Sequence, residues 1–453
     1  MNLVEFERKN DMTPFNFYLV TDTHYFENSL GVSGKAFDQY MKTEQYFMEE
    51  SASINKAIFK QIAEDTENEI VLMPGDLSKN GEIESHKSLI KELYKLRDAG
   101  KKIFVITAGH DYNEYSRGFV NDECVQVEGT KFEELYNLYY DFGYSEAIAV
   151  DKQTLSYVAE IAPKVRLLAV NCDSDEKNKG AIDDRLMQWL QIQIDDAKNN
   201  GCFIFGINHY PIIPPVPVFD LFGDTKVKEW RKVATFFADN GVNLFFTGHM
   251  HIQSINEFVT DNGNKFYDVC TSCSVGSPAK YRKVTINEDG VADIKSLDVP
   301  DFGWDTKGLS LQEYFDNQFA YSIVGRVERI FNGGKGFSKF LKTIGKKIVF
   351  SVKVGTIARL LWIRIDKSLK NVKLIDLIGN LGCEIFKGDL PHTPGTPLYN
   401  ALSKVFKRFN FIIKKVEPKL SKNGVNVDLV QMLLNTIGNN KELHDNNEMI
   451  NLG

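Results

Sequence analysis

The chain has 453 residues, of which 43% are hydrophobic, 12% aromatic and 25% charged. This composition is typical of a folded protein and excludes a mostly disordered or collagen-like chain. The length predicts more than one domain. A net charge of −7 argues against a nucleic-acid-binding protein as a whole, so we expect no nucleic acid as a partner.

Targeting and cysteine patterns point to a reducing compartment. Met1 to Asn10 are polar and charged where a secretory signal would place apolar residues, and no apolar stretch is long enough to cross a bilayer. Cys270 and Cys273 form the only C-x-x-C spacing, and no second pair completes a zinc site. We therefore expect a cytoplasmic protein in which these two cysteines are small buried strand residues.

In chain order, short apolar runs alternate with helical patterns up to about residue 250. The runs predict strands at 15–21, 70–73, 103–106, 166–170, 203–207 and 242–246, and the helical patterns cover 50–64, 82–99 and 183–199. Continuous β-rich runs between helices are typical of strands buried on both faces of an α/β sheet. Residues 264–298 then predict antiparallel strands with a turn at 287–290.

Polar side chains follow the carboxyl ends of these strands, where ligands bind in open α/β sheets. Five of the eight histidines lie there: His24, His110, His209, His249 and His251. Imidazoles and carboxylates are the ligands of divalent metal ions, so the pattern predicts metal-assisted hydrolysis. Two ions about 3.5–4 Å apart would generate a hydroxide and hold the attacking and leaving oxygens of a phosphoryl transfer. Asp76 could bridge them through its two carboxylate oxygens.

The ordered motifs Asp-x-His, Gly-Asp, Gly-His-Asp, His-x-Pro and Gly-His-x-His between about Phe15 and Leu297 resemble the calcineurin-like metallophosphoesterase superfamily. The resemblance implies a four-layer α/β/β/α sandwich with a dinuclear Mn, Fe or Zn centre. It implies that His110 contacts the phosphate and assists the leaving group, and that Asp111 orients His110. The implied ligands are Asp22, His24, Asp76 and His251 for one ion, and Asp76, His209 and His249 for the other.

One position departs from the superfamily pattern. Gly109 stands where an asparagine usually ligates the second metal, and glycine offers no side chain. We therefore expect a weaker second ion, with water, a backbone carbonyl or a nearby side chain as a substitute. Asn171-Cys172-Asp173 also follows a strand, and we interpret it as a structural turn or pocket wall.

The segment from Gly75 to Leu89 resembles the class III cyclic-nucleotide phosphodiesterase-like branch through its Asn-Gly-Glu and Ser-His motifs. Asn80 is the better candidate for lining a substrate pocket, although Asn-Gly also favours a simple turn. His86 is expected on a helix surface. Tyr112 and Tyr210 follow metal-site motifs and either line the pocket or pack beneath its loops.

The last third of the chain has a different charge. Residues 335–422 contain 16 Lys and 3 Arg against 3 Asp and 2 Glu, a local net charge of +14. With a glycine cluster at 333–336 as a hinge, we expect a catalytic domain at 1–305 and a mostly helical, basic domain at 306–453. Amphipathic helical patterns occur at 337–348, 354–365, 372–381 and 402–413, and 435–453 is expected to fray.

Three interpretations of the basic helices remain open. They could pack on each other or on the acidic catalytic domain, attach the protein peripherally to an anionic membrane, or bind another macromolecule. For the whole protein, the sequence predicts a phosphodiesterase acting on cyclic nucleotides or other small phosphoesters. The alternatives are a phosphomonoesterase with the same site, or a non-catalytic binding module that has lost a ligand at Gly109.

Overall fold

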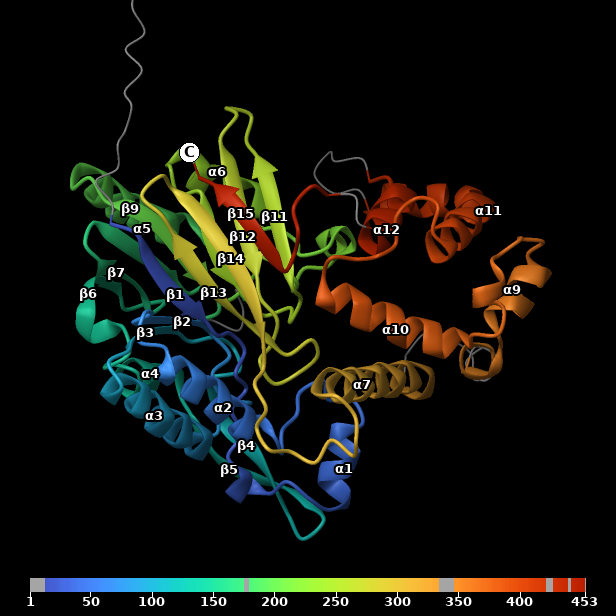
Figure 1. Ribbon diagram of the computed structural model, residues 1–453, viewed down its shortest axis with the longest axis horizontal. Helices are drawn as coiled ribbons and strands as arrows, with labels where there is room; N and C mark the ends of the chain where they lie inside the picture. The colour runs from blue at the N-terminus through green and yellow to red at the C-terminus, as the bar shows by residue number, and fades with distance from the viewer. Residues whose placement is uncertain (1–12, 175–178, 334–345, 421–426, 439–440, 453) are drawn as a thin grey trace, which may run out of the picture.

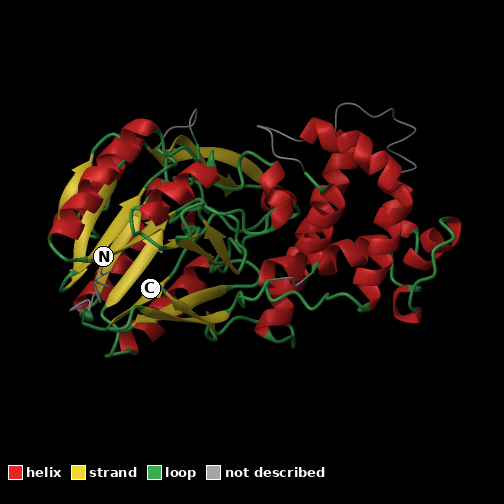
Figure 2. Ribbon diagram, turned by 90° about the horizontal axis from the view of Figure 1, so that it is seen from above, coloured by secondary structure: helices red, strands yellow, loops and turns green. Residues whose placement is uncertain are grey.

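The computed structural model describes residues 13–174, 179–333, 346–420, 427–438 and 441–452. Within them, two large sheets lie face to face with helices on both outer sides, which is the four-layer α/β/β/α arrangement (Figure 1). A separate group of helices lies beside the sandwich (Figure 2). The predicted α/β fold with a C-terminal helical region is therefore confirmed.

The first sheet has six described strands in the order β15-β14-β13-β1-β2-β3. Strands β1, β2 and β3 are parallel, and β13 runs antiparallel to β1. The bounds are β1 (Phe15–Leu19), β2 (Ile70–Pro74), β3 (Lys102–Ile106), β13 (Lys280–Ile286), β14 (Val291–Asp298) and β15 (Asn447–Asn451).

The second sheet has seven described strands in the order β11-β12-β10-β9-β8-β7-β6. Strands β8, β9, β10 and β12 are parallel, which brings their carboxyl ends to one edge. The bounds are β6 (Ala147–Asp151), β7 (Ser156–Ala162), β8 (Val165–Val170), β9 (Phe203–Asn208), β10 (Leu244–Thr247), β11 (Ser254–Val259) and β12 (Lys265–Cys270). A separate hairpin joins β4 (Asn113–Val120) to β5 (Glu123–Thr130).

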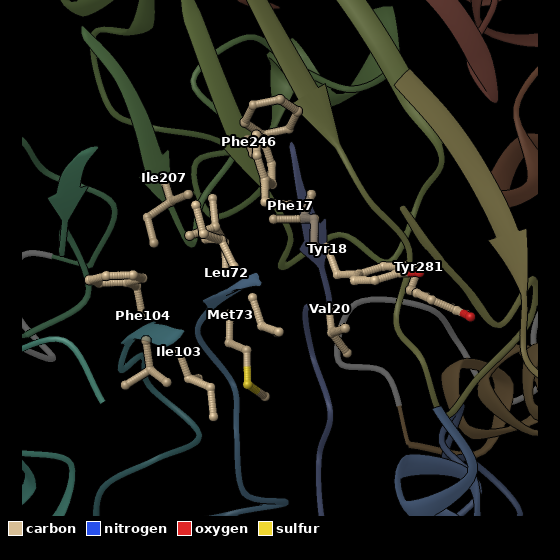
Figure 3. Packing of buried hydrophobic residues seen from close by; sticks show 14 of the residues in the cluster. Phe17, Tyr18, Val20, Leu72, Met73, Ile103, Phe104, Ile207, Phe246 and Tyr281 are labelled. Atoms are coloured by element: carbon tan, nitrogen blue, oxygen red, sulfur yellow. The ribbon is translucent and has the colours of Figure 1, made fainter. Parts of the chain in front are cut away.

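Aromatic side chains hold the two sheets together. Phe17 of β1 stacks on Phe205 of β9 with 5.5 Å between ring centroids, and meets Phe246 of β10 edge-on at 5.1 Å (Figure 3). All three rings are fully buried. Such pairs add to the hydrophobic stabilisation of the layer between the sheets. The rigid sandwich fixes where each strand ends, and therefore where the polar loops begin.

Helices cover the outer faces of the sandwich. They are α2 (Ser51–Glu64), α3 (Ile83–Asp98), α4 (Phe132–Leu138), α5 (Asp184–Asn199) and α6 (Trp230–Asp239), whereas α1 (Lys35–Met41) packs on the β4–β5 hairpin through Phe37 and Phe119. On α2, the buried residues Ile54, Ile58 and Ile62 recur every four positions, so one face of the helix packs on the first sheet. Helices α5 and α6 pack on the second sheet in the same manner.

The helical group contains α7 (Leu311–Gly333), α9 (Val354–Leu360), α10 (Leu374–Lys387), α11 (Pro397–Leu420) and α12 (Leu429–Ile437). Short 3-10 turns occur at Asn28–Leu30, Tyr144–Glu146, Pro217–Leu221 and Lys367–Leu369. Most of the predicted helix at 337–348, and the proposed hinge at 334–336, lie outside the described residues. No helix of the described ranges is both long and apolar enough to cross a membrane.

The C-terminal segment differs from its prediction. We expected 435–453 to fray, but residues 447–451 form β15, which pairs antiparallel with β14 at the edge of the first sheet (Figure 1). The prediction was wrong because a polar strand can be held by main-chain hydrogen bonds to an existing edge. The last strand of the sandwich thus comes from the end of the chain, beyond the helical group.

Candidate metal centre

The candidate site lies where strands of both sheets end. Each predicted residue occupies the loop directly after its strand, so the two sheets deliver side chains to one place. The loops after β1, β2, β3, β9 and β10 carry, in that order, Asp22 with His24, Asp76, His110, His209, and His249 with His251. All of these residues are buried except His110 and His249, which are half-buried.

The backbone is strained at five of these positions. The φ angles are 51° at Asp22, 33° at His24, 51° at Asp76, 65° at His249 and 58° at His251. Side-chain-bearing residues rarely adopt positive φ, and such outliers persist mainly at functional sites. The fold therefore maintains an unfavourable backbone where the predicted ligands lie.

The first cluster joins the two loops after β1 and β10. The Nε2 atom of His251 lies 3.2 Å from Asp22 Oδ1 and 3.2 Å from His24 Nε2. His24 Nε2 is also 3.8 Å from Asp76 Oδ2. The nearby thiol of Cys273 donates to the Asp22 carbonyl at 3.0 Å, which supports the strained loop.

The second cluster shares Asp76 with the first. His209 Nε2 lies 3.1 Å from Asp76 Oδ2, and His249 Nδ1 lies 3.3 Å from His209 Nε2. The same carboxylate oxygen thus faces a histidine of each cluster. A carboxylate shared by two clusters in this way would be able to bind a cation of each.

Backbone carbonyls set the tautomers of the two histidines in the second cluster. His209 donates from Nδ1 to the Pro74 carbonyl at 2.9 Å, and His249 donates from Nε2 to the Asp224 carbonyl at 2.8 Å. The opposite nitrogen of each ring is then left with a lone pair directed at the cluster. Metal-binding histidines typically have this second hydrogen bond.

The electrostatics fit a cation-binding site. Burial alone would lower the pKa of His209, but Asp76 opposes this and raises the pKa to about 10. Burial lowers the pKa of His249 to about 4, and the neighbouring His209 adds to that effect. The pKa of Asp76 is held well below its usual range because His209 and His110 outweigh its burial. The carboxylate of Asp76 is ionised, and a metal ion that displaces the proton from His209 would find imidazole nitrogens and a carboxylate, a donor set for divalent metals.

His110 lies beside both clusters. Its backbone N–H donates to Asp76 Oδ1 at 3.1 Å, and its ring centroid is 5.0 Å from that of His24. Its Nδ1 is 2.9 Å from the Lys79 carbonyl. The expectation that Asp111 orients this ring needs correction, because the Asp111 carboxylate accepts from the backbone N–H groups of Ser78 and Ala108 instead. Asp111 holds two loops together, and the Lys79 carbonyl orients His110.

His86 is not on a helix surface, so that prediction was wrong. It is fully buried, with Nδ1 2.6 Å from the Tyr139 hydroxyl and Nε2 2.9 Å from the Asp111 carbonyl. The helical pattern of α3 placed His86 on the inner face, next to the buried Leu89 and Leu93. His86 therefore supports the loop that carries His110.

The three predicted substrate residues have different surroundings. Tyr112 packs against Phe132 at the border of the core. Tyr210 is buried and stacks on His249 with ring centroids 3.8 Å apart. Asn80 is half-buried, and its loop is fixed by a hydrogen bond from Ser116 Oγ to the Asn80 carbonyl. Packing is thus the visible role of both tyrosines, and Asn80 stays the candidate for a substrate contact.

The loop between α1 and α2 contributes residues that sequence reasoning missed. The Gln45 side-chain amide is 2.6 Å from His251 Nδ1, and the Tyr46 ring lies 3.9 Å from the His24 ring. Lys79 approaches the Tyr46 ring at 4.7 Å and pairs with Glu44 at 3.2 Å. Burial opposes the charge of Lys79, but Glu44 outweighs it and raises this pKa. Nothing in the local sequence indicates that this loop would cover the site.

Asp173 is a further residue that was underestimated. It follows β8, is 3% exposed, and accepts from the Gly109 N–H at 2.6 Å through Oδ2. Burial, with the charge of Asp76, raises its pKa to about 6, and His209 acts in the opposite direction. Its position after a parallel strand was the available signal.

A known protein family matches the part of the chain that carries the candidate site. The calcineurin-like phosphoesterase family matches residues 15–253, more than half of the chain. A dimetal phosphatase from Danio rerio is similar at 13% identity over 63% of this chain and 97% of that chain, with a TM-score of 0.45. A purple acid phosphatase from yellow lupin, Lupinus luteus, is similar at 10% identity over 64% and 52%, with a TM-score of 0.44. No curated protein matches the chain.

Membership of the matched family implies a dinuclear divalent metal centre and a small phosphoester substrate. The paired clusters, the shared Asp76 and an unpartnered carboxylate oxygen on Asp173 are consistent with such a centre. On the match over residues 15–253, the chain belongs to the calcineurin-like phosphoesterase family, whose members are hydrolases acting on phosphoester bonds.

Proposed function

We propose that the protein is a metal-dependent phosphodiesterase that hydrolyses cyclic nucleotides or other small phosphodiesters. The observation that carries this proposal is the pair of buried clusters that share the Asp76 carboxylate. Asp22, His24, Asp76 and His251 would hold one ion, and Asp76, His209 and His249 the other. When bound, two Mn, Fe or Zn ions supply positive charge for the phosphate oxygens and an activated water.

His110 is the proposed proton donor to the leaving oxygen. Its Nδ1 donates to the Lys79 carbonyl, which leaves Nε2 as the atom that transfers a proton. Burial lowers the pKa of His110, and Asp76 opposes this effect. Donation from Nε2 requires the protonated imidazole, and a lowered pKa makes that proton easier to release while reducing the fraction of His110 that carries it at neutral pH.

The choice of a diester rests on sequence likeness and on the loop after β2. Residues 75–82 resemble the class III branch, and the same loop places Asn80 next to Lys79, whose carbonyl orients His110. Asn80 is therefore the proposed substrate contact. Its side-chain amide can donate to a phosphate oxygen or to a base.

The first test is hydrolysis of bis-p-nitrophenyl phosphate with added Mn²⁺, run beside the His110→Ala variant. We expect turnover to fall by about 10²–10⁴-fold while the bound metal content stays unchanged. His444→Ala is the matched control, since this histidine is largely exposed and lies on the C-terminal segment. Wild-type turnover in His110→Ala would remove His110 from the mechanism.

The monoester p-nitrophenyl phosphate distinguishes the alternative. Faster cleavage of the monoester, with the same dependence on His110, would replace the diesterase proposal by a phosphomonoesterase. Folded protein that binds two ions and cleaves neither compound would favour the binding-module alternative.

We also propose that the end of α9 attaches the protein to an anionic membrane surface on the cytoplasmic side. Leu360 and Trp362 are 74% and 89% exposed, and the flanking Arg359 and Arg364 are exposed as well. An apolar pair among basic residues can insert at a lipid headgroup layer. The local net charge of +14 at 335–422 supports this attraction.

Sedimentation with vesicles tests the membrane proposal. The protein should bind vesicles that contain phosphatidylserine, weakly bind pure phosphatidylcholine, and lose at least tenfold in affinity in a Leu360→Asn/Trp362→Ser variant. Ile192→Ser is the control, because Ile192 is 64% exposed on α5 of the sandwich. Equal binding by the double variant would contradict the proposal.

A further inference from the structure

The space in front of Gly109 is occupied by another residue. A Cβ atom added at Gly109 would lie 2.6 Å from Asp173 Oδ2 and 3.3 Å from Asp173 Cγ. The Asp173 carboxylate therefore begins where a side chain at position 109 would begin. A larger residue at 109 would therefore require the Asp173 carboxylate to move from this position.

Asp173 is held in this position by a network of side chains. Its backbone N–H donates to Asn171 Oδ1 at 2.8 Å, and the Asn171 amide contacts Thr107 Oγ1 at 3.5 Å. The Asn171 N–H in turn donates to Ser156 Oγ at 2.9 Å. The loop after β8 is thus fixed to the end of β3 in the opposite sheet.

One oxygen of this carboxylate lacks a partner. Oδ2 accepts from the Gly109 N–H, but Oδ1 is buried and has no hydrogen-bond partner among the described residues. A buried carboxylate oxygen without a partner is costly, and a cation is the partner that would satisfy it. Its electrostatic neighbours are His209 and Asp76 of the second cluster and the Lys179 ammonium, which makes no hydrogen bond to Oδ1.

We propose that Asp173 replaces the missing side chain at position 109 and completes the ligand set of the second cation. This inference rests on the proposed dinuclear site. Among the described residues, the ligand atoms of Asp76, His209 and His249 lie within 4.8 Å of one another, and Asp173 is not part of that group. We expect Asp173 to bind the ion directly after a rotation of its carboxylate, or through one bridging water.

The replacement changes the charge of the site. An asparagine would supply a neutral oxygen, whereas Asp173 supplies a third carboxylate beside Asp22 and Asp76. A further negative charge strengthens binding of a divalent cation in a buried site. Where the sequence led us to expect a weak second ion, we expect Asp173 to hold that ion more firmly than a site without its carboxylate would.

Metal content provides the test, independent of activity. After loading with Mn²⁺ and gel filtration, the wild type should retain two ions per chain and Asp173→Ala should retain one. Electron paramagnetic resonance should show coupled manganese in the wild type and uncoupled manganese in the variant. Asp65→Ala is the control, because Asp65 is a half-buried carboxylate that pairs with Lys283 and belongs to neither cluster.

An exchange of the two positions makes the test specific. Gly109→Asn alone should bind the second ion at least tenfold more weakly, because the new side chain collides with Asp173. The double variant Gly109→Asn/Asp173→Ala should restore two ions and the coupled spectrum. Two tightly held ions in Asp173→Ala would overturn the inference, and so would a wild type that holds a single ion. Loss of phosphodiesterase activity with both ions present would instead contradict only the proposed function.

Discussion

At the scale of single residues, Gly248 shows why the last motif begins with glycine. A Cβ atom at this position would lie 2.1 Å from Thr21 Oγ1 and 2.2 Å from Asp22 Oδ2. The N–H of His249 donates to both Asp22 oxygens at 3.1 Å. The backbone of one loop must therefore approach the carboxylate of another, and only glycine leaves room for that.

Gly248→Ala should displace Asp22 and weaken the binding of the first cation at least tenfold. Overpacking of this kind also costs about 1–3 kcal/mol of stability. Calorimetric titration with Mn²⁺ and urea unfolding measure the two effects. Gly223→Ala is the control, because no atom lies within 4 Å of its added Cβ. Unchanged Mn²⁺ affinity in Gly248→Ala would show that Asp22 does not depend on this approach.

The sequence predicted which residues converge, but it could not predict how they are held. His24, His209 and His251 follow strands, so their meeting place could be derived from strand order alone. The roles of Asp173 and His86 depend on contacts between segments far apart in the chain, such as Gly109 with Asp173. No local sequence pattern indicates a contact between residues that are 64 positions apart.

At the scale of elements, the buried strands were the most predictable part. The runs at 70–73 and 203–207 became β2 and β9 almost unchanged, because strands covered on both faces need continuous apolar residues. The hairpin of β4 and β5 was missed because many of its side chains are exposed and its pattern is polar. Edge strands carry a weak apolar signal.

Helix α3 provides a pH-dependent prediction through His86. Burial lowers the pKa of this histidine to about 4, although its hydrogen bond to the Asp111 carbonyl opposes the shift. Because the folded pKa lies below the unfolded value of about 6.5, His86 favours the folded state fully above pH 6.5. That stability is lost as the pH falls toward 4, since the unfolded chain then binds a proton that the folded chain excludes.

As the pH falls from 7 to 5, the titration of His86 should therefore lower the free energy of unfolding by about 2 kcal/mol. Urea unfolding of the wild type and His86→Gln at both pH values isolates this contribution, because other groups titrate equally in both proteins. His444→Gln, at an exposed site, should show the pH dependence of the wild type. If the free energies of unfolding of the wild type and His86→Gln differed by the same amount at both pH values, His86 would not be buried as a neutral imidazole.

At the scale of the whole molecule, the end of the chain is locked to the catalytic sandwich by Arg282. This arginine of β13 is fully buried, and burial lowers its pKa to about 10. It donates to the backbone carbonyls of Asp445 at 2.9 Å and Asn446 at 3.1 Å, and to Gln253 Oε1 at 2.6 Å. Gln253 lies two residues after His251, so the C-terminal segment is connected to a metal-site loop.

Helix α7 makes a second connection between the helical group and the site. Arg326 donates to the Thr43 carbonyl at 3.0 Å, and Phe315 packs on Phe47 with ring centroids 5.0 Å apart. Both contacts brace the loop that places Gln45 and Tyr46 over the first cluster. The helical region and the C-terminal strand thus support the site from two sides.

Deletion of residues 444–453 should consequently destabilise the sandwich. The deletion leaves the Arg282 charge buried without its tail carbonyls, a change that typically costs about 3–5 kcal/mol. Urea unfolding of the full and shortened chains measures the loss. Met449→Ala, at an exposed position on β15, should leave stability within about 0.5 kcal/mol of the wild type.

A double-mutant cycle then assigns the loss to Arg282. Arg282→Met should be strongly destabilising in the full chain, where it removes a satisfied network, and less destabilising in the shortened chain, where the guanidinium has already lost the carbonyls of Asp445 and Asn446. Mn²⁺ titration of the shortened chain should also show weaker binding. Without the C-terminal segment, Arg282 is held less firmly, and so is the loop of Gln253 and His251 to which it donates. If Arg282→Met cost the same free energy in both chains, the tail would be held by the pairing of β15 with β14 alone, and Arg282 would have no part in connecting the C-terminus to the metal centre.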